Sequence, residues 1–383
     1  MNQPETAPAS AAEGTRERQG VVLVRSVGAS GRAGGHEAVT RTGVARRLAA
    51  LKGFAFAGEH DPSKRYPGPV YLVPACTLVG IEAAQALGIR GEHDLFGAVV
   101  PHTFVATKVI THPLVADSAS APAGWSSAFP ERVRDAVLGG FSVFTVEDAR
   151  RAAARLLKRG PVRLKPVLAM GGRGQEVIEN VGELEKALAA MPPDELASHG
   201  LVLEEDLTDV TTYSVGQVRV GALLASYWGT QRLTPDNSGA AVYGGSDLVI
   251  ARGDFDALLA LGPPPEARLA IAQARAYDAA AMACFPGLIA SRRNYDVAQG
   301  TGPAGRRSGV LEQSWRIGGA SGAEIAALEA FHADPGLAAV RASTFEAYGA
   351  CEPPPHAAVY FRGTDEDVGM ITKYALVEPH GHA

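Results

Sequence analysis

Three polar residues alternate at the end of an apolar stretch, at Glu312, Ser314 and Arg316, and two glycines follow them. In a β-strand every second residue points to the same face, so we expect these side chains to project together. A carboxylate can hold Mg²⁺, and an arginine can bind an anion through two parallel N–H donors. The spacing predicts phosphate chemistry, although an edge strand with a solvated face would have the same pattern.

A second carboxylate, Asp296, lies in the extended stretch 294–297, and a glycine-rich hairpin at 300–309 separates it from Glu312. Neighbouring antiparallel strands place facing residues about 5 Å apart. Two carboxylates at that distance repel each other unless a divalent cation lies between them. We therefore predict that Asp296 and Glu312 share Mg²⁺.

Lys165 ends a predicted strand at 162–166, shortly before a glycine-rich turn. The turn consists of Gly171, Gly172, Arg173, Gly174 and Gln175. Glycines let backbone N–H groups approach a phosphate closely, and a lysine beside them adds a point charge. The P-loop spacing is absent, and no helix follows the turn as it does in dinucleotide-binding folds. The alternative is a plain hairpin turn with a solvated lysine.

Lys108 is a single charge in the apolar, strand-like stretch 104–110. Lysine is rarely buried without a partner, so we interpret it either as a phosphate ligand or as a side chain reaching water from an edge strand. The flanking His102 and His112 are interpreted as local packing.

A strand predicted at 201–205 ends in the acidic sequence Glu204, Glu205, Asp206 and Leu207. Two acids at a strand end are usually solvated. The sharper hypothesis is a hinge whose backbone and carboxylates contact an adenine and its ribose. A polar loop predicted at 233–245, with Gln231 ahead of it, is a candidate for the acceptor substrate, and a solvent loop is the alternative.

The elements that must position these residues alternate along the chain. From residue 21 to about 100, short apolar runs and helical stretches alternate, which indicates an α/β unit with a parallel sheet. A second unit begins near residue 139. There Thr145 and Asp148, then Asn180 and Glu183, have the spacing that caps a helix. Further on, a long alanine-rich helix is predicted at 266–284, and strands are predicted at 357–361 and 370–377.

Composition excludes several classes of protein. The chain has 383 residues, 46% of them hydrophobic and 20% charged, which is typical of a globular protein with a large core. The net charge of −5 and the absence of a basic stripe argue against nucleic acid as a partner. The three cysteines form no metal-ligand spacing, and no apolar run is long enough for a membrane span. A cytoplasmic protein is expected.

The order of these features over residues 21–331 resembles that of the ATP-grasp superfamily, and the chain looks like a bacterial branch of it. The resemblance implies that Lys108 and Lys165 hold nucleotide phosphates, that the turn at 171–175 closes over them, and that the hinge at 204–207 binds adenine. It implies that Asp296, Glu312 and Ser314 hold Mg²⁺. Arg316 would contact phosphate or acyl phosphate, so that Arg316 and Lys165 are the expected catalytic residues.

The resemblance also implies an architecture. It is α/β, with α+β nucleotide domains: an N-terminal parallel domain followed by two subdomains that enclose ATP. The expected segments are a disordered tail at 1–20, an N-terminal domain at 21–115, a small subdomain at 116–206, a core subdomain with the metal strands at 207–345, and C-terminal strands and a tail at 346–383.

The implied activity is an ATP- and Mg²⁺-dependent carboxylate–amine ligase that acts on small molecules through an acyl phosphate, with a homodimer as the expected assembly. Three residues depart from the superfamily pattern. Ser314 replaces an asparagine, Thr212 replaces a ribose-binding glutamate for which Asp209 or Glu205 could substitute, and Asn294 replaces an arginine. The alternatives are therefore an ATP-binding protein without turnover and an ATP-dependent phosphotransferase.

Overall fold

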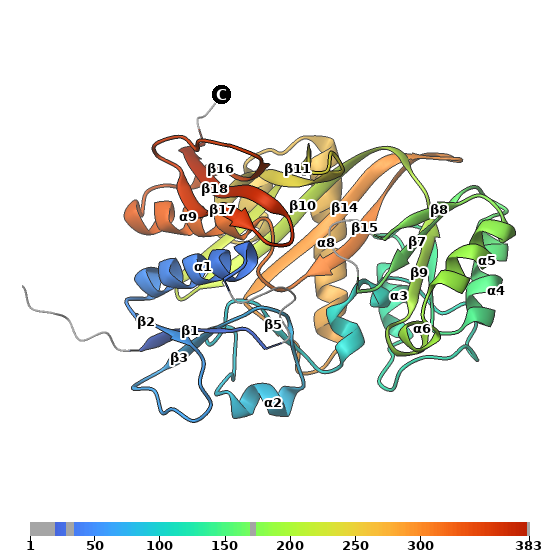
Figure 1. The fold of residues 1–383 in the computed structure, drawn as a ribbon, viewed down its shortest axis with the longest axis horizontal. Helices are drawn as coiled ribbons and strands as arrows, with labels where there is room; N and C mark the ends of the chain where they lie inside the picture. The colour runs from blue at the N-terminus through green and yellow to red at the C-terminus, as the bar shows by residue number, and fades with distance from the viewer. Residues whose placement is uncertain (1–19, 28–33, 169–173, 381–383) are drawn as a thin grey trace, which may run out of the picture.

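The computed structural model describes residues 20–27, 34–168 and 174–380 (Figure 1). An N-terminal α/β part and a small α/β lobe lie at opposite ends of a long antiparallel sheet (Figure 1). Among the helices of the described residues, none is both long and apolar enough to cross a membrane.

The N-terminal part is the parallel α/β unit that the sequence predicts. Strand β1 (Val21–Arg25) lies between β2 (Ala55–Glu59) and β3 (Val70–Pro74) and is parallel to both. Helix α1 (His36–Lys52) connects β1 to β2 and ends at Gly53, whose φ of 66° is a left-handed conformation that glycine adopts without strain. The buried face of α1 packs against β1 and β3 in one apolar cluster.

The segment after β3 combines a strand and a helix. It contains a short strand, β4 (Leu78–Val79), before helix α2 (Ile81–Ala86). Strand β4 pairs in parallel with β5 (Ala98–Val100), which in turn pairs with β13 (Ile289–Ala290). The small sheet thereby connects the N-terminal part to the segment that precedes Asp296.

The predicted strand around Lys108 is also wrong. Residues 103–111 form two 3-10 turns, η1 (Thr103–Ala106) and η2 (Lys108–Thr111). The hydroxyl of Thr107 accepts a hydrogen bond from the backbone N–H of Val109 and so begins the second turn. Consecutive apolar side chains here are all buried in one core cluster, and this burial needs no alternation between two faces.

The small lobe is a four-stranded antiparallel sheet with helices packed on it. In spatial order the strands are β6 (Gly140–Val143), β9 (Leu201–Glu205), β7 (Val162–Pro166) and β8 (Glu176–Ile178). The helices of the lobe are α4 (Val146–Leu156), α5 (Val181–Ala190) and α6 (Pro193–His199), whereas α3 (Ala128–Val133) packs against α8 (Pro265–Cys284). Both predicted caps are present: Thr145 Oγ1 accepts from the N–H of Asp148, and Asn180 Oδ1 accepts from the N–H of Glu183.

The central sheet has eight strands, each antiparallel to its neighbours. In spatial order they are β15 (Gly305–Ser314), β14 (Arg292–Gly302), β10 (Thr208–Val220), β11 (Leu223–Pro235), β12 (Ala241–Arg252), β16 (Ala339–Tyr348), β18 (Gly369–Pro379) and β17 (Ala358–Asp365). Helices α7 (Phe255–Ala260) and α8 (Pro265–Cys284) share a buried cluster with one face, and α9 (Ser321–Ala333) shares another with α1.

Two expectations for this sheet need correction. The polar segment 233–245 is mostly strand, because β11 continues to Pro235 and β12 begins at Ala241. The turn between them is short, and the side chain of Asp236 accepts hydrogen bonds from the N–H groups of Ser238 and Ala240. The boundary expected between residues 345 and 346 falls inside β16, and β17 and β18 continue the same sheet.

Candidate functional site

The hairpin of β14 and β15 places the two predicted metal carboxylates opposite each other. Asp296 and Glu312 are paired residues in the antiparallel register, as the hairpin at 300–309 predicts. Asp296 Oδ1 accepts hydrogen bonds from Gln231 Nε2 at 2.9 Å and from Asn294 Nδ2 at 3.0 Å. Burial and the nearby charge of Glu312 raise the pKa of Asp296 to about 6. The pair thus has the like-charge repulsion that a cation would relieve.

Lys108 compensates one of these carboxylates. Its Nζ lies 2.8 Å from Glu312 Oε2, and its side chain is only 4% exposed because η1 and η2 enclose it. The sequence predicted that Lys108 needs a partner if it is buried, and Glu312 is that partner. The ammonium group therefore lies beside the predicted metal strands.

Lys165 reaches the same hairpin from the small lobe. Its side chain and that of Glu204 are each 2% exposed, and Lys165 Nζ donates to Glu204 Oε1 at 2.9 Å. The same Nζ lies 3.5 Å from the carbonyl oxygen of Leu311, which immediately precedes Glu312 in β15. Lys108 and Lys165 thus converge on neighbouring residues of one strand.

Glu204 has a second basic partner, His112. Nε2 of His112, which is completely buried, lies 3.1 Å from Glu204 Oε2. Burial alone would raise the pKa of Glu204, but Lys165 and His112 outweigh it and lower that pKa to about 2. The sequence missed this role for His112, since nothing in the pattern connects residues 112 and 204.

The rest of the predicted hinge is held within the fold. Glu205 accepts from the guanidinium of Arg307 at 2.7 Å and from the N–H of Gly139 at 2.9 Å. Asp206 pairs with Arg163 at 2.6 Å. Leu207 belongs to a small apolar cluster. The other members of that cluster are Leu138, Ala298 and Leu311. The carboxylates of residues 204–206 are thus all paired with cations. The apolar cluster includes Leu311, whose carbonyl oxygen is the one near Lys165 Nζ.

Ser314 and Arg316 lie where β15 ends. Strand β15 ends at Ser314 and Arg316 lies two residues beyond it, so the strict alternation expected at Glu312, Ser314 and Arg316 holds only for the first two. Arg292 fixes this end: its guanidinium donates to the carbonyl oxygens of Ser314, at 2.9 Å, and of Arg316. A completely buried ion pair with Glu324 at 2.8 Å in turn holds Arg292.

Part of the predicted phosphate turn lies outside the described residues, namely Gly171, Gly172 and Arg173. Gly174 is described and has a φ of 66°, which suits glycine. The strands on either side, β7 and β8, pair antiparallel with each other, as a hairpin requires.

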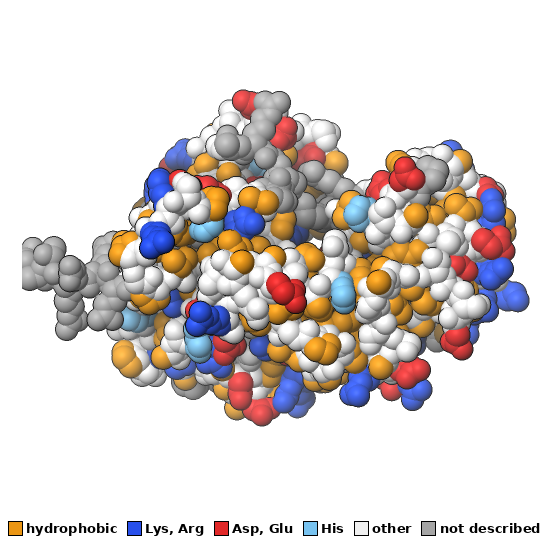
Figure 2. Space-filling model, turned by 90° about the horizontal axis from the view of Figure 1, so that it is seen from below, with side chains coloured by type: hydrophobic (Ala, Val, Ile, Leu, Met, Phe, Trp, Pro, Cys, Tyr) orange, Lys and Arg blue, Asp and Glu red, His pale blue; other side chains and the backbone are white. Residues whose placement is uncertain are grey.

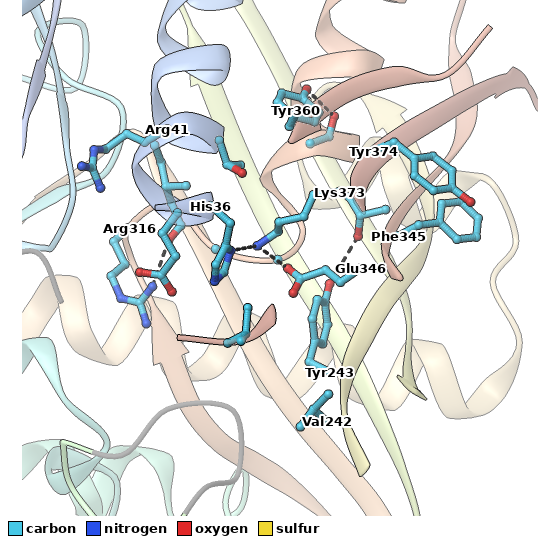
Figure 3. Close-up of a pocket in the computed structure, with 18 of the residues that line it drawn as sticks. His36, Arg41, Val242, Tyr243, Arg316, Phe345, Glu346, Tyr360, Lys373 and Tyr374 are labelled. Carbon is cyan, nitrogen blue, oxygen red and sulfur yellow. Dashed lines mark hydrogen bonds and ion pairs between the residues drawn. The ribbon is translucent and has the colours of Figure 1, made fainter. Parts of the chain in front are cut away.

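A cavity of about 300 Å³ adjoins this end of β15 (Figure 3). Arg316, Gly318 and Gly319 contribute to its wall, together with residues of α1, β16 and β18. The sequence did not identify the other charged residues and the histidine of the cavity. They are His36, Glu37, Arg41, Glu346 and Lys373. The first three lie on α1 and the last two on the paired strands β16 and β18, and the packing of α1 against β17 and α9 brings the two groups together.

The oxygen donors fit Mg²⁺ in kind. Asp296, Glu312 and Ser314 offer two carboxylates and a hydroxyl, and hard divalent cations prefer oxygen ligands. Among the residues that the structure describes, no group of three or more His, Cys, Asp or Glu side chains is arranged as a metal site. The metal assignment therefore stays a prediction.

Comparison with solved structures defines the class of fold. N5-carboxyaminoimidazole synthetase from Staphylococcus aureus matches with a TM-score of 0.51 and 11% identity over 94% of both chains. The same enzyme complexed with ADP matches with a TM-score of 0.51 and 14% identity, again over 94% of both chains. A phosphoribosylamine–glycine ligase from Thermotoga maritima has a TM-score of 0.47 and 12% identity, over 94% of this chain and 92% of its own. The chain has the ATP-grasp fold, and the expected α/β class is confirmed.

The family follows from the sequence match. Residues 24–375 match the model of a family described as "Protein of unknown function (DUF3182)", and the chain belongs to that family. No curated protein sequence matches the chain significantly.

Proposed function

We propose that this protein is an ATP- and Mg²⁺-dependent carboxylate–amine ligase. The observation that carries the proposal is the convergence of two buried lysines, Lys108 and Lys165, on adjacent residues of β15, opposite Asp296. Buried cations beside a pair of carboxylates are suited to polyphosphate held with a divalent cation. A synthetase of the same fold has been solved in complex with ADP, which supports nucleotide binding by this fold.

In this proposal each residue has a defined part. Lys108 and Lys165 bind the phosphate oxygens, and Gly171, Gly172, Arg173 and Gly174 are the further phosphate ligands that we propose from the sequence. Asp296, Glu312 and Ser314 hold Mg²⁺, which neutralises phosphate charge when it is bound. The backbone of Glu204, Glu205 and Asp206 and the apolar side chain of Leu207 contact adenine. Arg316, at the mouth of the neighbouring cavity, stabilises charge on the phosphoryl group that is transferred.

The proposed reaction has two steps. A carboxylate oxygen of the first substrate attacks the terminal phosphorus of ATP, which gives an acyl phosphate and ADP. The nitrogen of an amine then attacks the acyl carbon. A C–N bond forms, phosphate leaves and the nitrogen loses a proton. The chain contributes mainly by positioning and by electrostatic stabilisation of the phosphoryl oxygens.

Nucleotide binding is tested by the melting temperature. Mg-ATP should raise the Tm of the wild-type protein, because a ligand that binds only the folded state stabilises it. Lys165→Met should abolish this rise, whereas Lys186→Met, an exposed lysine on α5, should retain it. The difference in Tm with and without Mg-ATP is compared, because Lys165→Met itself lowers stability. If Lys165→Met keeps the full rise, the phosphate assignment is wrong.

Turnover is tested at Glu312. ADP release is measured with a panel of small carboxylates and amines, and Glu312→Gln should lose at least about 100-fold in kcat while Mg-ATP still raises the Tm. The exposed Glu366→Gln serves as the matched control. Unchanged turnover in Glu312→Gln would refute the metal assignment.

A second function has its own support. In the structure Lys108 and Lys165 are already paired with Glu312 and Glu204, so a nucleotide must compete with carboxylates for both. Together with Ser314 in place of asparagine, this favours an ATP-binding protein without ligase turnover. Stabilisation by Mg-ATP with no ADP release from any carboxylate and amine pair would support that alternative. Phosphate transfer to a hydroxyl acceptor would instead identify a phosphotransferase.

A further inference from the structure

The cavity beside Arg316 has the size and the lining of a small-molecule site. Its volume of about 300 Å³ is at the lower end of the range for ligand pockets. Its walls come from α1, from the segment 316–319 after β15, and from β16 and β18. Gly319 allows the ring of Tyr243 to approach, since a Cβ at this position would lie 2.4 Å from that ring. The wall next to the metal strands is therefore closely packed.

Arg41 is a buried cation of this cavity that forms no ion pair with a carboxylate of the described residues. Its side chain projects from α1 and is 7% exposed. Its Nη2 donates to Ser26 Oγ at 2.9 Å, and its Nε is buried without a hydrogen-bond partner. Within the described parts of the chain, no Asp or Glu oxygen lies within 4.0 Å of its guanidinium nitrogens. A buried charge without a counter-ion is costly, so an anion supplied from outside would be bound strongly.

Lys373 and Glu346, on the other wall of the cavity, compensate each other. Lys373 Nζ lies 2.8 Å from Glu346 Oε1, and the two side chains are only 15% and 14% exposed. Nδ1 of His36 lies 3.4 Å from the same Nζ, and burial with the charge of Lys373 lowers the pKa of His36. Figure 3 shows Arg41 and Arg316 on one side of the cavity and the group of Lys373 and Glu346 across from them. Arg41 and Arg316 are thus the two guanidinium groups of the lining that can pair with an incoming anion, and Glu37 is a further carboxylate of the lining.

Several aromatic side chains also line the cavity. Tyr243, Phe345, Tyr360 and Tyr374 all contribute to the wall. The rings of Phe345 and Tyr374 are stacked, with their centroids 4.6 Å apart. Aromatic side chains bury large apolar areas of a ligand and select flat or apolar groups.

We propose that this cavity binds a small amphipathic carboxylate, with its carboxylate paired to Arg41 and its apolar part between the aromatic side chains. The inference deepens the proposed function and rests on it, because a ligand here would lie beside Arg316 and the metal strands as the carboxylate substrate or the acceptor. Arg41 would then determine specificity for the charge, and the aromatic residues for the apolar part.

The test uses a thiol that lines the same cavity, Cys76. Benzoate, phenylacetate, 3-phenylpropionate and hexanoate are compared with their uncharged amides. The rate at which iodoacetamide alkylates Cys76 is measured by peptide mass spectrometry. A carboxylate present at ten times its Kd should slow the reaction about tenfold, and its amide should not. Cys284 on α8, which is not part of the cavity lining, reports non-specific effects in the same sample.

Two variants decide the role of Arg41. Arg41→Met should remove the protection of Cys76, and Arg41→Lys should weaken it, since lysine cannot bind a carboxylate in the bidentate way. Arg341→Met, an exposed arginine on β16 outside the cavity, should leave the protection intact. The inference is overturned if amides protect as well as carboxylates, if Arg41→Met and Arg41→Lys retain full protection, or if no carboxylate protects.

The experiments distinguish failure of the carboxylate site from failure of the proposed ligase function. A rise in Tm with Mg-ATP and no protection by any carboxylate would leave the nucleotide site standing and refute this inference. Protection that depends on Arg41, without any effect of Mg-ATP, would keep the carboxylate site and refute the ligase.

Discussion

Lys165 and Glu204 form an ion pair almost completely shielded from water, and His112 completes it. Such a pair adds little net stability compared with apolar residues, because removing both charges from water is expensive. We explain the pair by its effect on the position of Lys165. Glu204 holds the ammonium group of Lys165 next to β15, where we propose that the phosphates bind. In this arrangement Glu204 is a positioning residue for Lys165.

Removing the charge of Glu204 should be strongly destabilising. Glu204→Gln leaves the ammonium of Lys165 buried without a counter-charge, which costs roughly 3–5 kcal/mol of unfolding free energy. Urea denaturation monitored by circular dichroism measures it. Glu185→Gln breaks the exposed pair with Arg150, and its unfolding free energy should hardly change. Equal losses in the two variants would show that burial of the Lys165 pair does not matter.

The lowered pKa of Glu204 implies that the stability of the protein depends on pH. The pKa of Glu204 is lowered in the folded state from an ordinary 4.5 to about 2, so its contribution to stability is complete above pH 4.5 and is lost as the pH falls towards 2. The wild type should have a higher free energy of unfolding than Glu204→Gln at about pH 5. This difference should shrink by on the order of 2 kcal/mol when the pH falls from 5 to 3. Urea midpoints of both proteins at each pH measure this. A constant difference would contradict the lowered pKa.

At the scale of the elements, the hairpin of β14 and β15 depends on its contact with the segment 136–138. The N–H of Val310 donates to the carbonyl of Ala136 at 2.8 Å. Gly309 makes this approach possible, because a Cβ there would lie 2.5 Å from backbone atoms of Val137 and Leu138. Glycine is required here for close packing of two backbones.

Gly309→Ala should therefore displace the hairpin that carries Glu312. We expect a loss of about 1–3 kcal/mol in unfolding free energy, as for other overpacked sites, and a smaller rise in Tm with Mg-ATP than in the wild type. Gly91→Ala is the matched control, since a Cβ at Gly91 meets no atom within 4 Å and its φ is not left-handed. If Gly309→Ala were as stable as the wild type, the hairpin and the segment 136–138 could move apart without cost.

The sequence predicted those elements whose signals are local. The strand of Lys165 and the caps at Thr145 and Asn180 follow from short patterns, and the structure has them. The stretch around Lys108 and the segment 233–245 were predicted wrongly, because packing against the core and pairing with neighbouring strands decided their conformation.

At the scale of the whole molecule, the C-terminal strands belong to the central sheet. Strand β18 pairs with β16 from Val340 to Tyr348, and β17 closes the edge. Ile371 and Ala375 of β18 are buried, and Tyr360 of β17 packs in the cluster that joins α1 and α9. These strands therefore also form part of the cavity beside Arg316.

A chain that ends at residue 345 should not fold cooperatively, because it cuts β16 and leaves the apolar faces of α1 and α9 exposed to water. Circular dichroism during heating and size-exclusion chromatography measure the outcome, with the full chain as reference. A cooperative transition of the shortened chain at the wild-type Tm would show that residues 346–383 form a separate unit.

Seen from below, the molecule has charged side chains of both signs interspersed among apolar and neutral ones (Figure 2). This agrees with the mixed composition and modest net charge of the chain. A face of this kind offers no broad field of one sign, so long-range steering of a charged polymer is not expected from it.

The sequence by itself determined the residues that can do phosphate chemistry and their order along the chain. It also predicted that Asp296 and Glu312 face each other, because a short hairpin fixes the register of its two strands. Only the tertiary structure decided that Lys108 pairs with Glu312, that His112 and Glu204 hold Lys165, and that Arg41 and Lys373 meet in one cavity. These residues are far apart in the chain, in one case by more than 300 positions. Their proximity arises from the packing of whole sheets and helices, which no local sequence pattern encodes.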